Sequence, residues 1–192
     1  QVKFNVEGYP RIVDGDTLAF QSKSGEKEKV RLLGIDAPES KQMCKNAKGA
    51  SYECGVESKA YLETIIGKDP VLCLAAKRDR YSRVLGVCFD EKTGKDLNEK
   101  MVAEGEAIAY VQFSKAYVAD EELAKTGHKG LWQGEFQKPW DYRKMMRTKA
   151  KAAPPPKTQT TDSFVLSANP KVKMAKSEFP MPDYFEDLDD AE

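Results

Sequence analysis

The sequence predicts an α+β fold in which a small β barrel dominates. Five apolar or alternating runs have the length of strands, and three segments have the spacing and stop signals of helices. The first helical segment lies between the third and fourth strand-like runs. Five strands with a helix inserted after the third fit the OB-fold, a five-stranded Greek-key barrel. A chain of 192 residues is long enough to bury the core of one such domain.

The first three strands are expected near the start of the chain. Residues 2–20 alternate or run apolar and are broken at Gly8-Tyr9-Pro10 and at Asp14-Gly15, which predicts two strands. After a turn at residues 24–26, Val30–Ile35 is the third strand. Residues 40–51 are mostly polar or small, so we expect a loop there.

The remaining elements follow the same reasoning. The first helix is expected over Tyr52–Ile66, where apolar residues form one face, and Gly67 ends it. Two apolar runs flank a turn and should pair as the last hairpin; they are Val71–Ala75 and Val84–Phe89. Further helices are predicted over Asp96–Glu104 and Lys115–Lys129. The last segment of the domain should pack on its core through Leu131, Trp132, Phe136 and Trp140.

The four cysteines predict two disulfides rather than a metal site. The chain has one histidine, His128, and no Cys-x-x-Cys pair, so a zinc site is not expected. Cys44 and Cys54 bracket the polar loop, and Cys73 and Cys88 lie on the two runs of the hairpin, so both pairs can reach disulfide geometry. Disulfides are favoured over free buried thiols and indicate an oxidising compartment.

Two further features agree with that compartment. No apolar run reaches the roughly 20 residues that span a bilayer. The sequence opens at Gln1 without a basic and apolar leader, as in a protein whose signal peptide has been removed. We therefore expect a secreted or periplasmic protein.

Three charged residues gather around the end of the third predicted strand. Arg31 lies inside an apolar run, where a long cation needs a partner or an open cleft. Asp36 and Glu39 follow, and Pro38 between them favours a fixed turn that presents both carboxylates at the mouth of the strand. One guanidinium and two carboxylates can hold a metal ion and a phosphate. The alternative is a structural set of ion pairs, such as Arg31 with Glu39.

Other motifs complete a pattern that resembles the staphylococcal-nuclease family, the calcium-dependent thermonucleases. One is Val-Asp-Gly-Asp-Thr at residues 13–17, and another is Asp-Arg-Tyr-Ser-Arg at residues 79–83. They stand in family order with Arg-Leu-Leu-Gly-Ile-Asp-Ala-Pro-Glu at residues 31–39 and Gly-Leu-Trp at residues 130–132. The match covers roughly residues 4–143. This resemblance implies an SNase-like OB-fold with three helices.

The resemblance also implies roles for the charged residues. Asp16 and Asp36 match the carboxylates that bind Ca²⁺. Ala37 stands where the family often has Thr, and it would bind the ion through its backbone carbonyl. Arg31 and Arg83 match the arginines that grip the scissile phosphate. The general base of the family corresponds to Glu39.

Four more residues are assigned around this centre. Arg80 and Tyr81 lie where the family contacts a terminal phosphate, with Arg80 in place of a lysine. Tyr110 matches, with an offset of one residue, an aromatic near the base pocket. Stacking of bases on aromatic rings would favour single strands. Asp14 is either a second-shell carboxylate or a structural turn residue.

These assignments predict an enzyme. We expect a monomeric, calcium-dependent, sugar-nonspecific nuclease that hydrolyses phosphodiester bonds of DNA and RNA and leaves 3′-phosphates. The alternative is a non-catalytic SNase-like module that binds nucleic acid or a protein. Such modules generally lose charges of the site, and this chain keeps all five, namely Asp16, Arg31, Asp36, Glu39 and Arg83.

The end of the chain differs from the rest in composition. Residues 1–147 carry 25 Lys and Arg against 23 Asp and Glu, residues 148–177 carry 6 against 1, and residues 178–192 carry 0 against 7. We predict one nuclease domain over residues 1–147 and a flexible tail over residues 148–192, with a Pro-rich basic linker and an acidic end. The acidic end is expected to be solubilising; alternatively it covers a cationic nucleic-acid groove or docks on a partner.

Overall fold

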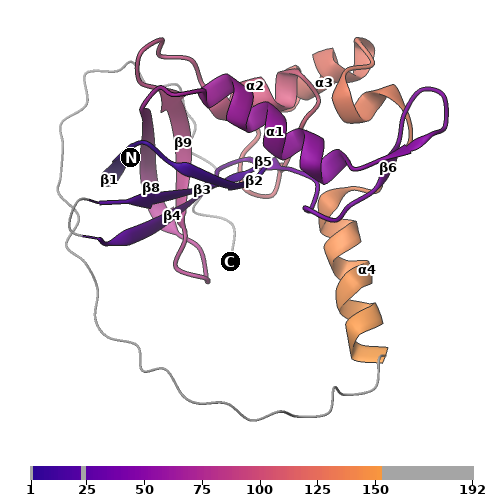
Figure 1. Ribbon diagram of the computed structural model, residues 1–192, viewed down its shortest axis with the longest axis horizontal. Coiled ribbons are helices and arrows are strands. Elements are labelled where there is room, and N and C mark those ends of the chain that lie inside the picture. The colour runs from indigo at the N-terminus through magenta and orange to yellow at the C-terminus, as the bar shows by residue number, and fades with distance from the viewer. Residues whose placement is uncertain (1, 23–24, 153–192) are drawn as a thin grey trace.

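The structure is a computed structural model that describes residues 2–22 and 25–152 (Figure 1). A six-stranded sheet forms a curled half-barrel, with strand order β1-β8-β9-β4-β3-β2. All neighbouring strands are antiparallel except β4 and β9, which run parallel. The strands of this sheet are β1 (Phe4–Gly8), β2 (Arg11–Asp14), β3 (Thr17–Gln21), β4 (Lys27–Leu32), β8 (Val71–Arg78) and β9 (Val84–Asp90).

Two small ladders and five helical segments complete the described fold. The ladders pair β5 (Ile35–Asp36) with β10 (Ile108–Ala109), and β6 (Cys44–Lys45) with β7 (Ser51–Tyr52). The helical segments are α1 (Cys54–Ile66), α2 (Leu97–Ala103), α3 (Val118–Thr126), the 3-10 helix η1 (Gly130–Gln133) and α4 (Pro139–Ala152). Together with the curled sheet, they confirm the predicted α+β, OB-type fold.

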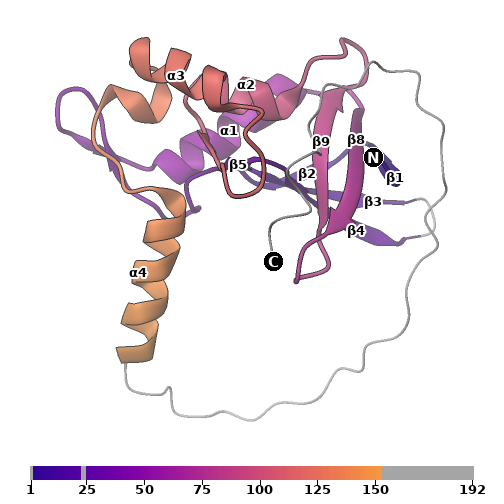
Figure 2. The same ribbon diagram turned by 180° about the vertical axis from the view of Figure 1, so that it is seen from behind.

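The main core lies between the curled sheet and the helices α1 and α2. It includes Leu18, Val30, Leu62, Val71 and Met101, all of which are fully shielded from solvent. Figure 2 shows α1, α2 and α3 gathered over one end of the sheet, whereas α4 extends away from it. In both views α4 and the β8–β9 turn project on the same side of the molecule, below the barrel (Figures 1 and 2).

The structure differs from the sequence prediction in several elements. The predicted strand Val30–Ile35 is divided by a turn at residues 33–34 into the end of β4 and the start of β5. Residues 2–20 form three strands instead of two, because both predicted breaks end a strand. The predicted loop of residues 40–51 contains one strand of the β6–β7 ladder, and the pairing of Tyr52 with Cys44 delays the start of α1 to Cys54. A fourth α-helix, α4, follows the three that were expected and crosses residue 147, the predicted end of the domain. The predicted linker and acidic end beyond residue 152 lie outside the described residues.

The cysteines and the last segment pack as expected. Disulfides join Cys44 to Cys54 and Cys73 to Cys88, and the second pair faces across β8 and β9. A cluster around the first disulfide contains the aromatic and aliphatic residues predicted to close the domain; they are Leu131, Trp132, Phe136 and Trp140. Within the described ranges, no helix is both long and apolar enough to cross a membrane.

Candidate active site

The Asp-Gly-Asp turn connects β2 to β3 and fixes the first carboxylate of the site. The backbone N–H of Asp16 donates to Asp14 Oδ1 (3.2 Å), which closes the turn locally. A Cβ at Gly15 would collide with Ser58 Oγ of α1 and with the Ala37 side chain. Only a glycine therefore lets the turn pass this close to α1, and this close approach determines where Asp16 lies.

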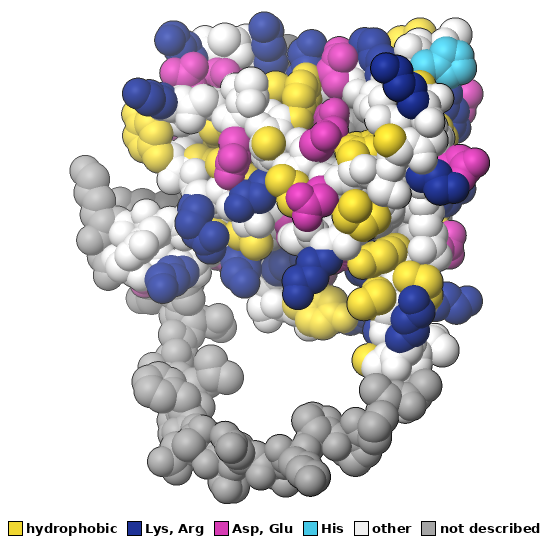
Figure 3. All heavy atoms as spheres, turned by 45° about the vertical axis from the view of Figure 1, so that its right-hand side comes forward, with side chains coloured by type: hydrophobic (Ala, Val, Ile, Leu, Met, Phe, Trp, Pro, Cys, Tyr) yellow, Lys and Arg dark blue, Asp and Glu magenta, His cyan; other side chains and the backbone are white. Residues whose placement is uncertain are grey.

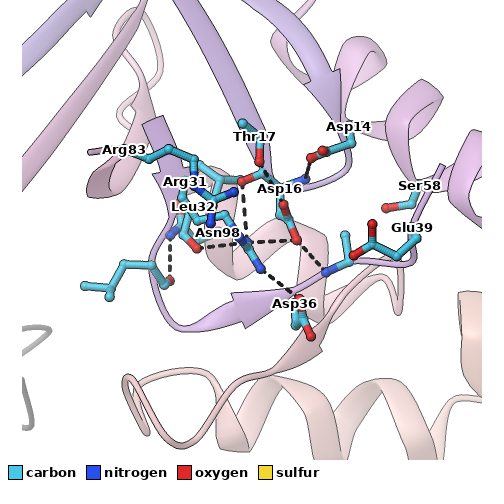
Figure 4. Close-up of polar contacts among 12 residues, drawn as sticks. Asp14, Asp16, Thr17, Arg31, Leu32, Asp36, Glu39, Ser58, Arg83 and Asn98 are labelled. Carbon is cyan, nitrogen blue, oxygen red and sulfur yellow. Dashed lines mark hydrogen bonds and ion pairs between the residues drawn. The ribbon is translucent and has the colours of Figure 1, made fainter. Parts of the chain in front are cut away.

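Arg31 joins two carboxylates that come from different parts of the chain. Its Nη1 lies 2.8 Å from Asp16 Oδ2, and its Nη2 donates to Asp36 Oδ1 at 2.8 Å. The position of Arg31 follows from the sheet, since it faces Thr17 on β3 and Leu85 on β9. Figure 4 shows its guanidinium between the two aspartates. The three residues have exposed fractions of 6% (Asp16), 9% (Arg31) and 0% (Asp36), so water screens these ion pairs little.

Further hydrogen bonds hold Asp16 in place. Its Oδ2 accepts from the backbone N–H of Ala37 (2.8 Å), and its Oδ1 accepts from the Thr17 hydroxyl (3.0 Å). The bond to Ala37 connects the β2–β3 turn to the segment that follows β5. The predicted metal ligands Asp16, Asp36 and Ala37 are therefore adjacent in space, although 19 residues of sequence lie between the two aspartates.

A second arginine, which sequence reasoning did not predict, binds the same carboxylates. Arg143 on α4 donates from Nη1 to Asp36 Oδ1 and from Nη2 to Asp36 Oδ2, both at 2.9 Å. Its Nη1 also donates to Glu39 Oε1 (2.9 Å). The side chains thus form a continuous chain of ion pairs, Asp16–Arg31–Asp36–Arg143–Glu39.

Burial and neighbouring charges shift the pKa values at this site. Burial, with the adjacent charge of Asp16, raises the pKa of Asp14 to about 7. Burial also raises the pKa of Asp36, against the opposing effect of hydrogen bonds from Arg143 and the charge of Arg31. Burial acts to lower the pKa of Arg143, but its bonds to Asp36 and Glu39 outweigh this and raise it. Burial thus disfavours the charged forms of Asp14 and Asp36, and the two arginines offset part of this effect at Asp36.

The loop that carries Glu39 is held at both ends. Gln42 is buried, accepts from the Glu39 backbone N–H (3.2 Å) and donates to the Gln137 carbonyl (2.6 Å). A Cβ at Gly55 would collide with the Glu39 carbonyl, so α1 packs directly on this loop. The Cys44–Cys54 disulfide lies next to this loop, since Cys54 Sγ is 3.4 Å from the Gln42 carbonyl oxygen. Glu39 therefore sits on a braced loop and keeps a partly exposed carboxylate, with 41% of its side chain accessible.

Arg83 approaches the site from the other side. It precedes Val84, which faces Val30 in the parallel β4–β9 ladder, and its Nε donates to Asp79 Oδ2 (2.7 Å). Although burial opposes it, hydrogen bonds from Arg83 lower the pKa of Asp79. In Figure 4, Arg83 and Glu39 lie on opposite sides of the Arg31 guanidinium. Within the described part of the chain, the ion-pair partner of Arg83 is Asp79 and not a carboxylate of the site.

The predicted substrate-binding residues lie in two places. Tyr81, on the β8–β9 turn, is 63% exposed, and the guanidiniums of Arg80 and Arg83 lie 4.9 and 5.6 Å from its ring centroid. Tyr110 is half-buried and stacks on Trp140 with ring centroids 5.1 Å apart. The first group is open to a ligand, whereas the second connects β10 to the start of α4.

The donor set of the site suits a hard divalent ion. Among the described residues, no group of three or more His, Cys, Asp or Glu side chains could hold a metal ion. The predicted set differs from such a group, since it has two carboxylates and one backbone carbonyl. Hard oxygen ligands of this kind suit Ca²⁺ or Mg²⁺. Asp16 and Asp36 also lie close enough together for one guanidinium, that of Arg31, to contact both of them.

Two structural residues of the site were also missed by sequence reasoning. Asn98 on α2 is fully buried, accepts from the Cys88 N–H, and donates to the carbonyls of Leu33 and Gly86. It thereby fixes the end of β4 against β9. Gln42, described above, does the same for the Glu39 loop. A polar residue within an apolar helical pattern was the available signal for Asn98, whereas Gln42 and Arg143 lie in polar segments without a motif.

A curled OB-type barrel with this charged site defines a protein of the nuclease-like class. The model of the family described as staphylococcal nuclease homologue matches residues 29–134, more than half of the chain, and the chain belongs to that family. The matched residues include Arg31, Asp36, Glu39 and Arg83, whereas Asp16 precedes them.

The chain is also similar to curated bacterial proteins. It is 35% identical over 130 residues to the succinoglycan biosynthesis protein ExoI of Rhizobium meliloti, which is 67% of this chain and 65% of that protein. It is 36% identical over 124 residues to an uncharacterized endonuclease of Haemophilus influenzae, 64% of this chain and 63% of that protein. An uncharacterized endonuclease of Escherichia coli is 30% identical over 136 residues, 69% of this chain and 81% of that protein. The match thus spans just under two thirds of the first two relatives.

Proposed function

We propose that this protein is a calcium-dependent, sugar-nonspecific nuclease that hydrolyses phosphodiester bonds of DNA and RNA and leaves 3′-phosphates. The observation that carries the proposal is the pairing of one buried arginine with two buried aspartates, one from the β2–β3 turn and one from β5, beside Glu39. Two of the relatives described above are named endonucleases, in agreement with this activity. The resemblance stated from the sequence motifs supplies the calcium dependence and the product type.

In this proposal each residue of the site has a separate role. Asp16, Asp36 and the carbonyl of Ala37 would hold the ion, which would supply positive charge next to the phosphate and lower the pKa of a neighbouring water. Arg31 and Arg83 bind phosphate oxygens through charge-assisted hydrogen bonds, since guanidinium stays protonated at any working pH. To reach the phosphate, Arg83 exchanges its bond to Asp79 for one to the substrate.

Glu39 takes the role of general base. Its carboxylate is partly exposed, and the Arg143 guanidinium contacts both this carboxylate and that of Asp36. Glu39 is therefore close enough to the ion-binding residues to accept a proton from, or to orient, a water next to the reacting phosphorus. The braced loop fixes its position, which matters because a displacement of about 1 Å can cost about 100-fold in rate.

The nucleic acid strand is proposed to extend over the β8–β9 turn. Arg80 and Tyr81 are exposed there and would contact a neighbouring phosphate and base. On the face drawn in Figure 3, Lys and Arg side chains outnumber Asp and Glu in the lower part, the side on which the β8–β9 turn and α4 project. Tyr110 remains a candidate for base stacking, next to its partner Trp140. Single strands are favoured, because their bases are free to stack.

The experiment that tests the proposal is cleavage of heat-denatured DNA and of RNA, with calcium and with EDTA. We expect cleavage with calcium and none with EDTA. Arg83→Ala should lower kcat by about 100-fold or more, the usual cost of removing one donor to transition-state charge. Lys92→Ala, beyond the opposite end of β9, is the matched control and should keep full activity. With an oligonucleotide that carries a fluorophore on its 5′ end, phosphatase treatment should change the mobility of the labelled products only if they end in 3′-phosphates.

The outcomes separate the enzyme from a binding module. Cleavage that survives in EDTA would falsify the metal mechanism. Binding of the same oligonucleotides without cleavage under any condition would favour the non-catalytic module instead.

We further propose that the protein works as a monomer outside the cytoplasm, in a secreted or periplasmic location. The two disulfides support the compartment, because such bonds persist in oxidising environments and are rare in the cytosol. Thiol titration of protein isolated from its native compartment tests this: four free thiols would contradict it.

A further inference from the structure

Arg143 uses up most of the hydrogen-bonding capacity of Asp36. A carboxylate has about four acceptor positions, two on each oxygen. On Asp36, Oδ1 accepts from Arg31 and from Arg143, and Oδ2 accepts from Arg143. Three of about four positions are therefore filled, and Arg143 fills two of them. The same guanidinium also takes one position on Glu39.

Arg143 therefore occupies carboxylate oxygens that a bound metal ion and its neighbouring water would need. Asp36 cannot offer an open oxygen edge to an ion while Arg143 holds both of its oxygens. Glu39, likewise, binds a guanidinium rather than a water. Arg31 does not have this effect, because it occupies one position on Asp36 and leaves Oδ2 free. A positively charged ion and Arg143 thus compete for the same buried negative charge.

The helix that carries Arg143 is attached to the domain mainly through its first turns. Trp140 stacks on Tyr110, and the Tyr142 hydroxyl donates to the Lys41 carbonyl at 3.3 Å. From Met146 to Lys151 the side chains are exposed, and Figure 1 shows this end of α4 away from the sheet. No residue of α4 other than Trp140 belongs to the hydrophobic clusters of the described chain. The helix can therefore leave without unfolding the barrel.

We propose that Arg143 is an internal cation that occupies the ion-binding side of the site, and that a divalent ion displaces it and releases α4. This inference rests on the proposed calcium dependence. In this proposal α4 has two positions. When α4 is docked, arginines bind the carboxylates of the site. When α4 is released, Asp36 can bind the ion and Glu39 can bind the water.

The test is calcium binding by titration calorimetry on the full chain at mildly alkaline pH, without nucleic acid. Arg143→Met keeps an apolar side chain and removes the guanidinium. Arg143→Lys keeps the positive charge but loses the planar group that can bind two carboxylate oxygens at once. Arg147→Met is the matched control, because it removes the same charge from an exposed position one turn further along α4. Thermal unfolding of each variant confirms that it is folded.

The sign of the effect decides the question. If Arg143 competes with the ion, Arg143→Met binds calcium about tenfold more tightly than the wild type or better, since one charge-assisted hydrogen bond is worth at least about that factor. Arg143→Lys falls between them, and Arg147→Met matches the wild type. Unchanged or weaker binding by Arg143→Met overturns the inference, because Arg143 then supports the site instead of competing for it.

Hydrogen exchange gives a second readout, which would not change if Arg143 altered calcium binding through its charge alone. In the wild type, calcium should increase amide exchange over residues 139–152; in Arg143→Met, exchange there should be fast with or without calcium. Calcium-independent exchange in the wild type contradicts release of α4. If the wild type binds calcium and cleaves DNA but Arg143→Met binds no better, only this inference fails. If neither protein binds calcium, the proposed metal mechanism fails with it.

Discussion

Glu106 makes the stability of this protein depend on pH in a way that can be measured. Its carboxyl group lies partly buried before β10, close to Glu57 and Glu104. Burial, followed by these two like charges, raises the pKa of Glu106 from 4.5 to about 7. The folded protein therefore holds a proton on Glu106 at pH values where the unfolded chain has lost it.

The sign and size of the effect follow from linkage. Well below pH 4.5, Glu106 is neutral in both the folded and the unfolded state and does not affect the free energy of unfolding. Between pH 4.5 and about 7 the unfolded state binds fewer protons than the folded state, so the free energy of unfolding falls as pH rises. The rise of the Glu106 pKa from 4.5 to about 7 corresponds to roughly 3 kcal/mol. Because the side chain is partly exposed, solvent screening reduces this to about 2 kcal/mol.

Glu106→Gln removes the ionisation and tests this reasoning. Urea unfolding at about pH 8 should show the variant to be more stable than the wild type by about 2 kcal/mol, and the difference should vanish near pH 4. The exposed residue Glu91 supplies the control, Glu91→Gln, which should match the wild type at both pH values. If Glu106→Gln is no more stable than the wild type at alkaline pH, burial does not destabilise the charged form of Glu106, and the raised pKa is wrong.

Three further changes test the residues that hold the site. Asn98→Ala should lower the free energy of unfolding in urea by about 3 kcal/mol, because it leaves the buried Cys88 N–H and a carbonyl unsatisfied; an unchanged midpoint contradicts its bracing role. Gly15→Ala should cost about 2 kcal/mol or more and weaken calcium binding, since the new Cβ collides with α1; calorimetry with normal affinity would count against it. Replacing Cys44 and Cys54 by Ser should cost about 3 kcal/mol in the chain-entropy model and slow turnover through the Glu39 loop; wild-type melting and turnover would refute this.

The sequence was sufficient where the signal is local. The apolar runs of β3, β4, β8 and β9 have the length of strands and are bounded by turn residues, and the two disulfides follow from cysteines placed on a hairpin and around a loop. Both aspartates of the site could be named because each belongs to a short motif at a turn. Their meeting at Arg31 depends on the sheet register, which the structure adds.

The elements that were missed carry little local signal. β2 has four residues, and β5, β6, β7 and β10 have two each, which is too short for any periodicity. α4 combines many basic residues with few apolar ones, so it does not show the apolar stripe of a core helix. Arg143 reaches Asp36 across 107 residues of sequence, and only tertiary packing determines such a contact.

We propose above that Asp16, Asp36 and the Ala37 carbonyl hold one divalent ion, while Arg31 and Arg83 bind the phosphate next to it. A crystal structure with calcium and a non-cleavable dinucleotide tests this most directly. We expect anomalous density for calcium in contact with both aspartates, a phosphate between the two arginines, and Arg143 no longer bound to Asp36. Calcium bound elsewhere, with Arg31 still joining the two aspartates and no phosphate at Arg83, would contradict it.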